Sequence, residues 1–409
     1  MKRRMMAAVM AGTLALAPAA VSQAQTPQRW IAAWLAPPIG YEPKIRDALG
    51  RPFDNETARQ TVRAGVAGQQ LRVRLTNALS DIPLTIGAAS IGRLDAAGKV
   101  VPGSIRPLAF NGAKGVTIPA HAPYLSDPVA MPVAAGETFA VSIYYPGEAA
   151  PPAHAQMLDV TAGDATGDAV LKDAQHVRAS GLVSALEVSG KVKPRVLVAF
   201  GDSITEGAGS SPGKAMSWPA QLGKMLAATP QGWCWSIVNA GISGNRLLHD
   251  GRGPDALSRF DRDVLAVPGV THVALLEGIN DIGEIKDPAR IDEAVSADQI
   301  IGAYRQLLAR AHARGVKVIV GTLTPYEGAG YASARGETKR ETVNAWIRAH
   351  ASEFDGLIDF DKAMGEPGQP KELRLAEQIG DHLHPNDAGY TRMAKTAMPE
   401  VLKDRCPAR

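Results

Sequence analysis

A serine, a histidine and an aspartate stand at positions that suit an activated oxygen nucleophile. Ser203 lies in the string Gly201-Asp202-Ser203, which directly follows the apolar run 196–200. Asp381 and His384 stand three positions apart near the C-terminal end. A serine hydroxyl needs an adjacent base at neutral pH, and a carboxylate on the other ring nitrogen orients that base. The set therefore predicts Ser203 as nucleophile, His384 as base and Asp381 as the orienting group.

Two further positions suit the stabilisation of a negative oxygen. The tetrahedral intermediate of such chemistry needs preorganised hydrogen-bond donors. Gly244, in the turn 239–245, offers a backbone N–H that no side chain shields, and Asn280 offers a side-chain amide. Together with the backbone N–H of Ser203 they predict an oxyanion hole. Each string alone is also typical of an ordinary turn, so the prediction depends on the ordered set.

In this order the four motifs resemble the blocks of the SGNH hydrolases, the GDSL-type esterases and lipases, over about residues 194–404. The resemblance implies the roles given above and a flavodoxin-like sheet flanked by helices. The β-rich first part, with the string 277–282, also resembles a two-domain subgroup of secreted bacterial members. The α/β-hydrolase elbow fits less well, because Thr205 stands where Gly-x-Ser-x-Gly requires glycine.

The elements that position these residues alternate between strand and helix from about residue 194. Apolar runs predict buried strands, and amphipathic stretches predict helices between them. The strands are expected at 196–200, 236–240, 272–276, 316–322 and 357–360, and the helices at 215–228, 297–314, 337–353 and 388–402, the last capped by Asn386. This alternation predicts a three-layer α/β/α domain over 194–409, with a parallel sheet whose carboxyl edge gathers the motifs.

The preceding part, 25–190, reads as a separate β-rich domain. Alternating apolar and polar residues predict half-buried strands at 71–76, 84–91 and 138–145. Several short strands separated by turns favour a sandwich or jelly-roll-like arrangement.

Residues 1–24 have the pattern of a secretory signal peptide. Basic residues at 2–4 precede an apolar stretch, and a small-x-small site predicts cleavage after Ala24. We therefore expect a secreted or periplasmic protein without stable membrane insertion. The whole chain has 44 basic and 41 acidic residues, and its first 24 hold three of the basic ones and no acidic one. The mature chain is thus formally neutral, and its charge gives no reason to expect nucleic acid as a partner.

The preferred function is hydrolysis of short-chain carboxylic esters, acetyl esters above all, through an acyl-enzyme on Ser203. Export favours a small soluble ester or an acetylated polysaccharide as substrate, which includes carbohydrate deacetylation. One alternative is acyl transfer from the same site to a sugar or lipid. Another is a glycan-binding protein whose β-domain offers Trp30, Trp34 and Tyr124 as stacking faces. The motifs do not separate hydrolysis from transfer, and oligomeric state stays open.

No cofactor and no metal are expected. His382 and His384 could face one side, but no third ligand has suitable spacing. Cys234 and Cys406 either pair or stay as free thiols.

Three polar residues beside the motifs are assigned structural or surface roles. We expect Asp202 to accept structural hydrogen bonds and Asp281 to shape its loop. Arg246 is a candidate substrate contact, but a solvated arginine is the favoured interpretation.

Overall fold

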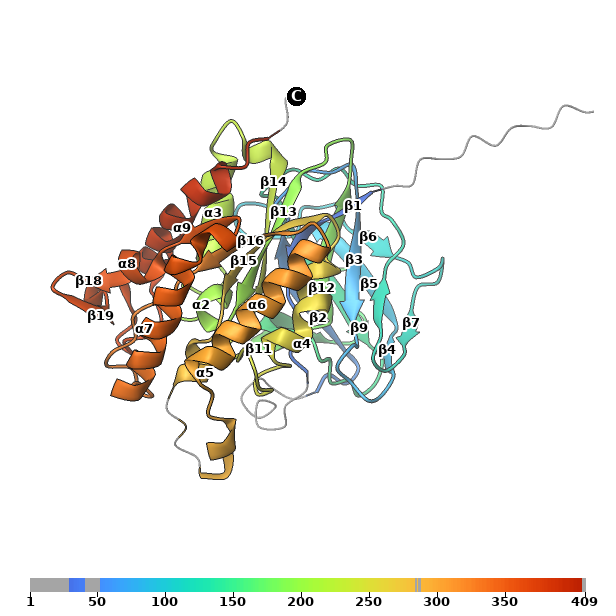
Figure 1. The fold of residues 1–409 in the computed structure, drawn as a ribbon. Helices are drawn as coiled ribbons and strands as arrows, with labels where there is room; N and C mark the ends of the chain where they lie inside the picture. The colour runs from blue at the N-terminus through green and yellow to red at the C-terminus, as the bar shows by residue number, and fades with distance from the viewer. Residues whose placement is uncertain (1–28, 41–51, 284, 286–287, 407–409) are drawn as a thin grey trace, which may run out of the picture.

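The computed structural model describes residues 29–40, 52–283, 285 and 288–406. The chain forms a strand-rich region followed by an α/β region (Figure 1). The predicted signal peptide, 1–24, lies outside the described residues.

The α/β region is built on a parallel five-stranded sheet. Its strands are β13 (Arg195–Gly201), β14 (Trp235–Gly241), β15 (Val270–Leu276), β16 (Lys317–Gly321) and β17 (Gly356–Ile358). They lie in the order β14-β13-β15-β16-β17. Numbered along the chain this is 2-1-3-4-5, the flavodoxin-like order, in which ligands bind beyond the carboxyl ends of the first and third strands. The predicted fold class is confirmed.

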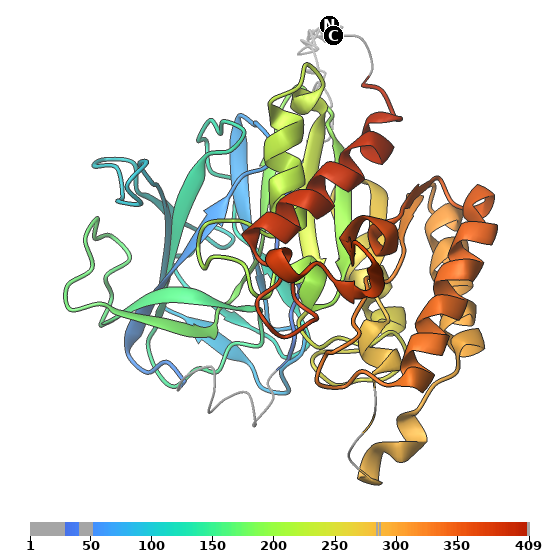
Figure 2. The same cartoon turned by 90° about the vertical axis from the view of Figure 1, so that its left-hand side faces the viewer.

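Helices cover both faces of this sheet. The long ones are α3 (Trp218–Ala227), α6 (Ala297–Ala313), α7 (Ala334–Ala349) and α9 (Asp387–Leu402). Right-handed crossovers place α3 and α9 on one face and α6 and α7 on the other. In agreement, α3 packs against α9 and α6 packs against α7 (Figure 2).

Short elements lie between the long helices and the strands. They are α2 (Ser203–Glu206), α4 (Ala256–Phe260), a π-helical turn (Asp261–Leu265), α5 (Ile279–Ile282), α8 (Phe360–Met364), the hairpin β18 (Gly365–Glu366) and β19 (Gln369–Leu373), and single 3₁₀ turns at Gly232–Cys234, Pro288–Glu293, Ala351–Glu353 and Leu375–Glu377.

Helices α7 and α9 each begin after a residue whose side chain caps the first turn. The Asn386 side chain accepts from the N–H groups of Ala388 at 3.0 Å and Gly389 at 3.2 Å, so the predicted cap of α9 is confirmed. Helix α7 begins at Ala334, earlier than the predicted start at 337. Its cap is Ser333, whose Oγ accepts from the N–H of Gly336 at 3.1 Å. The prediction missed this turn because it lies in a polar stretch without apolar periodicity.

The strand-rich region contains two larger antiparallel sheets. One has the order β1-β12-β3-β8 and the other β11-β10-β2-β9-β5-β6, and a separate pair joins β4 to β7. The strands are β1 (Trp30–Leu35), β2 (Glu56–Arg63), β3 (Gln70–Thr76), β4 (Leu84–Ile86), β5 (Ala88–Arg93), β6 (Arg106–Leu108), β7 (Val116–Ile118), β8 (Pro123–Leu125), β9 (Thr138–Tyr145), β10 (Ala155–Ala162), β11 (Gln175–Ser180) and β12 (Val183–Ser189). The β-rich region is therefore confirmed, while its sandwich class and exact boundaries stay predictions.

The predicted strand 84–91 is in fact two strands. They separate at Gly87, and β4 and β5 then pair with different partners.

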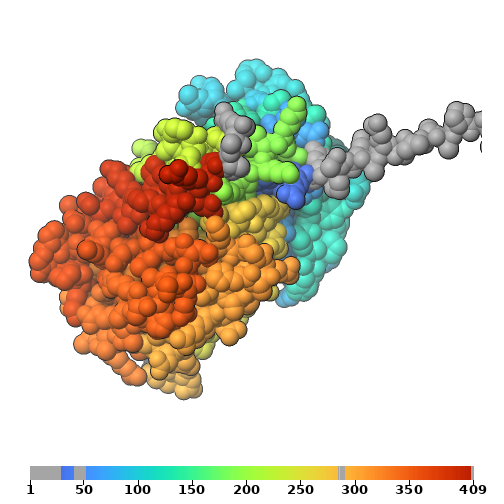
Figure 3. Space-filling model, turned by 45° about the horizontal axis from the view of Figure 1, so that its top comes forward, coloured from blue at the N-terminus to red at the C-terminus, as the bar shows by residue number. Residues whose placement is uncertain are grey.

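The two regions meet along the first strand of the chain. Strand β1 packs against β14, and the Oγ of Ser236 donates to the carbonyl of Ala32 at 2.7 Å. The N–H of Ala32 donates to the carbonyl of Pro268 at 2.9 Å. The space-filling view shows the two regions in contact along the face that it draws (Figure 3).

The C-terminal tail is fastened at the amino end of the sheet. Cys234 and Cys406 form a disulfide with Cα atoms 6.1 Å apart, which decides the alternative left open by the sequence. Nearby, the carboxylate of Asp404 pairs with Arg195 at 2.9 Å and Lys317 at 2.7 Å. None of the helices in the described part of the chain combines the length and apolar character needed to cross a membrane.

Candidate active site

The strand-to-helix turn after β13 presents Ser203 at the start of α2. A Cβ on Gly201 would lie 2.1 Å from the carbonyl oxygen of Leu276, so only glycine fits between these strands. Asp202 caps α2, since its carboxylate accepts from the N–H of Ile204 at 2.8 Å. Ser203 is the first helical residue and is only 5% exposed.

A hydrogen-bonded chain joins Ser203, His384 and Asp381. The Oγ of Ser203 lies 2.9 Å from Nε2 of His384, and Nδ1 of His384 lies 2.6 Å from Oδ2 of Asp381. The other oxygen of Asp381 accepts from the N–H groups of Leu383 at 3.0 Å and His384 at 2.9 Å. The structure thus brings together the three residues that were predicted as a catalytic set, within hydrogen-bond reach of one another.

The surroundings keep Asp381 ionised. Burial raises the pKa of this carboxyl, but hydrogen bonds from the backbone and ring of His384 and from Leu383 outweigh burial, so the pKa is lowered. An ionised carboxylate can only accept, so Nδ1 of His384 carries the hydrogen. This tautomer leaves Nε2 free to accept the proton of the Ser203 hydroxyl.

The two predicted oxyanion donors lie in neighbouring loops at the same edge of the sheet. Gly201 is in register with Gly241 and Leu276, so the three loops leave the sheet at one level. Gly244 has φ +74°, a conformation that favours glycine. Asn280, in α5, donates from Nδ2 to the carbonyl of Asn245 at 2.9 Å, which ties its loop to the residue after Gly244.

The amide of Asn280 is held from its other end by a tyrosine that the sequence interpretation did not single out. The hydroxyl of Tyr331 donates to Oδ1 of Asn280 at 3.3 Å. Oδ1 accepts from Tyr331 and one N–H donates to Asn245. Among the described residues no acceptor takes the second N–H of the amide, which can donate to a ligand.

A buried arginine, also missed by the sequence interpretation, ties these loops together from below. Arg259 is wholly buried and donates to the carbonyls of Gly201 at 2.9 Å and Ala240 at 2.8 Å. It also donates to Oδ1 of Asn245 at 2.8 Å, and its guanidinium lies 4.0 Å from the ring centre of Phe200. The residues around Arg259 in the sequence do not predict that its side chain is buried, because its burial depends on contacts with distant strands and loops.

Three acidic side chains near the site are buried. Burial raises the pKa of Asp202 to about 7 and that of Asp281 to about 6, and it raises the pKa of Glu277 well above its usual range. Asp281 accepts from the N–H groups of Leu247 at 2.7 Å and Leu248 at 3.1 Å, so it holds the loop after β14, whereas the prediction was that it shapes its own loop.

The prediction that Arg246 is a solvated arginine is wrong. Its side chain is not solvated but buried, at 6% exposure, and pairs with Glu293 at 2.5 Å. This ion pair joins the loop after β14 to the 3₁₀ turn that precedes α6.

His382 lies outside the hydrogen-bonded chain. It has φ +58°, and its ring packs against Gly328. Among the described residues, no three or more His, Cys, Asp or Glu side chains are grouped so as to hold a metal ion.

The aromatic residues considered for glycan stacking are engaged in packing. The guanidinium of Arg72 lies 4.3 Å from the ring centre of Trp30, and Trp34 is partly buried against the core. The ring of Tyr124 packs edge-on against Phe110.

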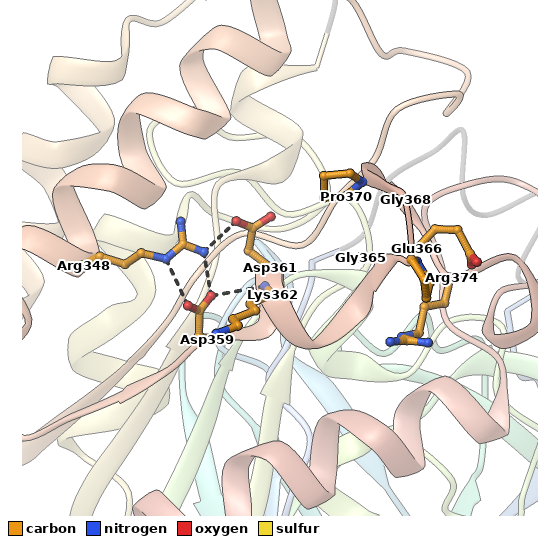
Figure 4. A pocket seen from close by; sticks show the side chains of 10 residues that line it. Arg348, Asp359, Asp361, Lys362, Gly365, Glu366, Gly368, Pro370 and Arg374 are labelled. Atoms are coloured by element: carbon orange, nitrogen blue, oxygen red, sulfur yellow. Dashed lines mark hydrogen bonds and ion pairs between the residues drawn. The ribbon is translucent and has the colours of Figure 1, made fainter.

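A surface pocket lies beside the hairpin β18–β19 (Figure 4). Arg348 pairs with Asp359 at 2.7 Å and with Asp361 at 2.6 Å inside it. Its lining residues include none of the predicted catalytic or oxyanion residues, and its two aspartates are already paired. The chain of Ser203, His384 and Asp381 is therefore the better candidate.

Comparison with known proteins finds a family model that matches the α/β region. Residues 199–392 match the model of the GDSL-like Lipase/Acylhydrolase family. This match confirms the predicted GDSL-type resemblance over these residues and supports an ester-hydrolysing enzyme. The two-domain secreted subgroup stays a prediction. A search of curated proteins finds no match.

Solved structures similar to this chain cover about half of it. A lipolytic protein of the G-D-S-L family from Desulfitobacterium hafniense is 23% identical and covers 50% of this chain and 98% of its own, with a TM-score of 0.39. An acylhydrolase from Bacteroides fragilis is 24% identical over 52% of this chain and 88% of its own, with a TM-score of 0.40. The acetylxylan esterase Axe2 from Geobacillus stearothermophilus is 23% identical over 53% and 98%, also with a TM-score of 0.40.

Proposed function

We propose that the protein is an exported serine esterase that hydrolyses short-chain carboxylic esters, with acetyl esters preferred, through an acyl-enzyme on Ser203. The observation that carries the proposal is the hydrogen-bonded chain from Ser203 through His384 to Asp381. The GDSL-like family of the α/β region supports ester hydrolysis as the class of reaction.

The reaction begins when the Oγ of Ser203 attacks the ester carbonyl and Nε2 of His384 takes the hydroxyl proton. The tetrahedral oxyanion accepts hydrogen bonds from the N–H groups of Ser203 and Gly244 and from the amide of Asn280. The intermediate collapses, the ester C–O bond breaks, and His384 returns the proton to the leaving alcohol. Water then attacks the acyl group with His384 again as base, which releases the acid and restores Ser203.

The substrate class follows from the sequence rather than from the comparisons. An exported enzyme meets soluble esters and acetylated polysaccharides, and the chain has no long apolar insertion of the kind that covers a long-chain lipase site. We therefore place a small-molecule or polysaccharide acetyl ester ahead of a long-chain lipid.

The test is hydrolysis of 4-nitrophenyl acetate, butyrate and octanoate by the exported protein. Its intact mass is expected to be that of a chain that begins at Gln25. The acetate is expected to give the highest kcat/KM. Ser203→Ala and His384→Ala are expected to lower kcat by about 10⁴-fold or more. A fluorophosphonate probe should label wild type on the peptide that contains Ser203.

Ser258→Ala and His312→Ala are the matched controls, because both residues lie in the α/β region. The Ser258 hydroxyl donates to the nearby carbonyl of Asp255, and His312 pairs with Asp355 near the surface. These variants should retain wild-type rates. Hydrolysis that survives Ser203→Ala would refute the mechanism, and an inactive wild type would refute ester hydrolysis on these substrates. If an added alcohol is present and its ester forms in place of the free acid, the enzyme transfers the acyl group to an alcohol rather than to water.

A further inference from the structure

Glu206, the last residue of the helix that begins with Ser203, is bonded to both regions of the chain. One of its carboxylate oxygens accepts from the backbone N–H of Ser243, the residue before Gly244. The other oxygen lies 3.1 Å from Nε2 of His154 and 3.7 Å from Nη2 of Arg178. His154 precedes β10 and Arg178 lies in β11, so both belong to the strand-rich region.

His154 is fixed at both ends of its ring. It is 8% exposed, and its Nδ1 lies 3.2 Å from the carbonyl oxygen of Pro37. A carbonyl and a carboxylate are both acceptors, so the ring lies between one acceptor at Nδ1 and another, Glu206, at Nε2. The ring therefore holds a defined position between the strand-rich region and α2.

Glu206 is rigid and charged. The side-chain amide of Asn239 donates to the carbonyls of Thr205 at 2.8 Å and Glu206 at 3.3 Å, which fastens α2 to β14. Burial raises the pKa of Glu206, but His154, Ser243 and Arg178 outweigh it and lower the pKa to about 2. An ionised carboxylate makes a stronger and shorter bond to a backbone N–H than a neutral acceptor does.

We infer that the strand-rich region positions the oxyanion loop, through the contact of His154 with Glu206 and of Glu206 with the N–H of Ser243. His154 is in this sense a positioning residue for the N–H of Gly244, and the strand-rich region is part of the active site rather than a separate binding module. The inference rests on the proposed function, because it concerns the oxyanion donors of that reaction.

Loss of the His154 ring leaves Arg178, whose side chain is 53% exposed, as the described ion-pair partner of this Glu206 oxygen. The carboxylate is then free to turn toward water, and the turn 242–245 loses its fixed acceptor. Removal of one oxyanion donor typically costs 10²–10³ in kcat. Displacement of a donor should cost less, about 10-fold, and should act on the transition state rather than on substrate binding.

The experiment compares His154→Ala, His154→Gln and Glu206→Gln in the full mature protein with 4-nitrophenyl acetate. His176→Ala is the matched control, because His176 lies in β11, as Arg178 does, but pairs on the surface with Asp159 at 2.8 Å. We expect His154→Ala to lower kcat about 10-fold with KM within twofold, and to weaken inhibition by a trifluoromethyl ketone by a similar factor. His154→Gln, which can still donate to Glu206, should recover most of both.

A folded His154→Ala variant with wild-type kcat and wild-type inhibition would overturn the inference. If that variant fails to fold, Glu206→Gln provides the test: it retains the shape but weakens the bond to Ser243, and wild-type kcat there would overturn the inference equally. Loss of activity in Ser203→Ala with a wild-type rate in Glu206→Gln would leave the proposed function standing and this inference refuted. An inactive wild type would refute both.

Discussion

Asn280, a candidate oxyanion donor, shows how two neighbours hold a side-chain amide in one orientation. An amide has a donor end and an acceptor end, and a ligand oxyanion needs only the donor. In this site Tyr331 donates to Oδ1, and the Asn245 carbonyl takes one hydrogen of Nδ2. The amide is thereby held in the orientation that offers its remaining N–H.

Tyr331→Phe is therefore expected to lower kcat on 4-nitrophenyl acetate by about 3- to 10-fold, the value of one ordinary hydrogen bond. KM should change by less than twofold, because the orientation of the amide matters most when the oxyanion forms. Tyr144→Phe is the control, since its hydroxyl donates to an asparagine far from the site, Asn55, at 2.7 Å. Equal kcat values for the two variants would contradict the assigned role of Tyr331.

A second effect at the residue scale concerns Asp202. Burial raises the pKa of this carboxyl to about 7 in the folded chain, from an unfolded value of 3.8. Between these pH values the folded state holds a proton that the unfolded state releases. The free energy of unfolding therefore falls as pH rises from about 4 to about 7, and above that range the full cost of the buried charge applies.

Asp202→Asn removes this charge and keeps an oxygen that accepts from the N–H of Ile204. We expect the Tm of the variant, relative to wild type, to be about 3 to 8 °C higher at pH 8 than at pH 5, as calorimetry would measure. Asp95→Asn is the control, because Asp95 is exposed and also accepts backbone N–H groups, from Ala97 and Lys99 at 2.9 Å. Parallel pH curves for the two variants would refute the prediction.

At the scale of elements, the disulfide and the active site lie at opposite ends of the sheet. Cys234 comes just before β14, whereas Ser203 follows the carboxyl end of β13 and is hydrogen-bonded to His384. Asp404 gives the same tail a second attachment through Arg195 and Lys317. The covalent bond should therefore contribute to stability without controlling the chemistry.

Replacement of both cysteines by serine is expected to lower the free energy of unfolding by about 2–4 kcal/mol. The kcat on 4-nitrophenyl acetate at 25 °C should stay within twofold of wild type. Thermal unfolding with and without a phosphine reductant checks this, and the double variant, which has no disulfide, should not respond to the reductant. A wild-type Tm that is insensitive to reduction, or activity lost at an unchanged Tm, would count against this assignment.

Prediction from the sequence succeeded where local pattern decides the structure. The strands of the parallel sheet are rich in apolar residues, and the cap of α9 is visible as Asn386. The start of α7 was missed because its cap, Ser333, follows no apolar period, and the strand at 84–91 was not seen to divide at Gly87.

At the scale of the whole molecule, the sequence predicted the order of the motifs but not the contacts between regions. The meeting of the candidate catalytic residues could be predicted because the carboxyl ends of parallel strands gather at one edge. The contacts of Arg259 and His154 could not be predicted, because their partners, such as Gly201 and Glu206, lie far away along the chain. Their burial depends on how the two regions pack, which no local spacing encodes.

The covalent link between Cys234 and Cys406 also affects how the molecule tolerates a broken backbone. Proteases preferentially cut exposed loop tips, and the hairpin of β18 and β19 is such a tip. A cut there separates Ser203 from His384 along the chain, but Cys234 remains on the first fragment and Cys406 on the second. Ser203 and His384 would thus stay in one molecule under oxidising conditions and part only when the bond is reduced.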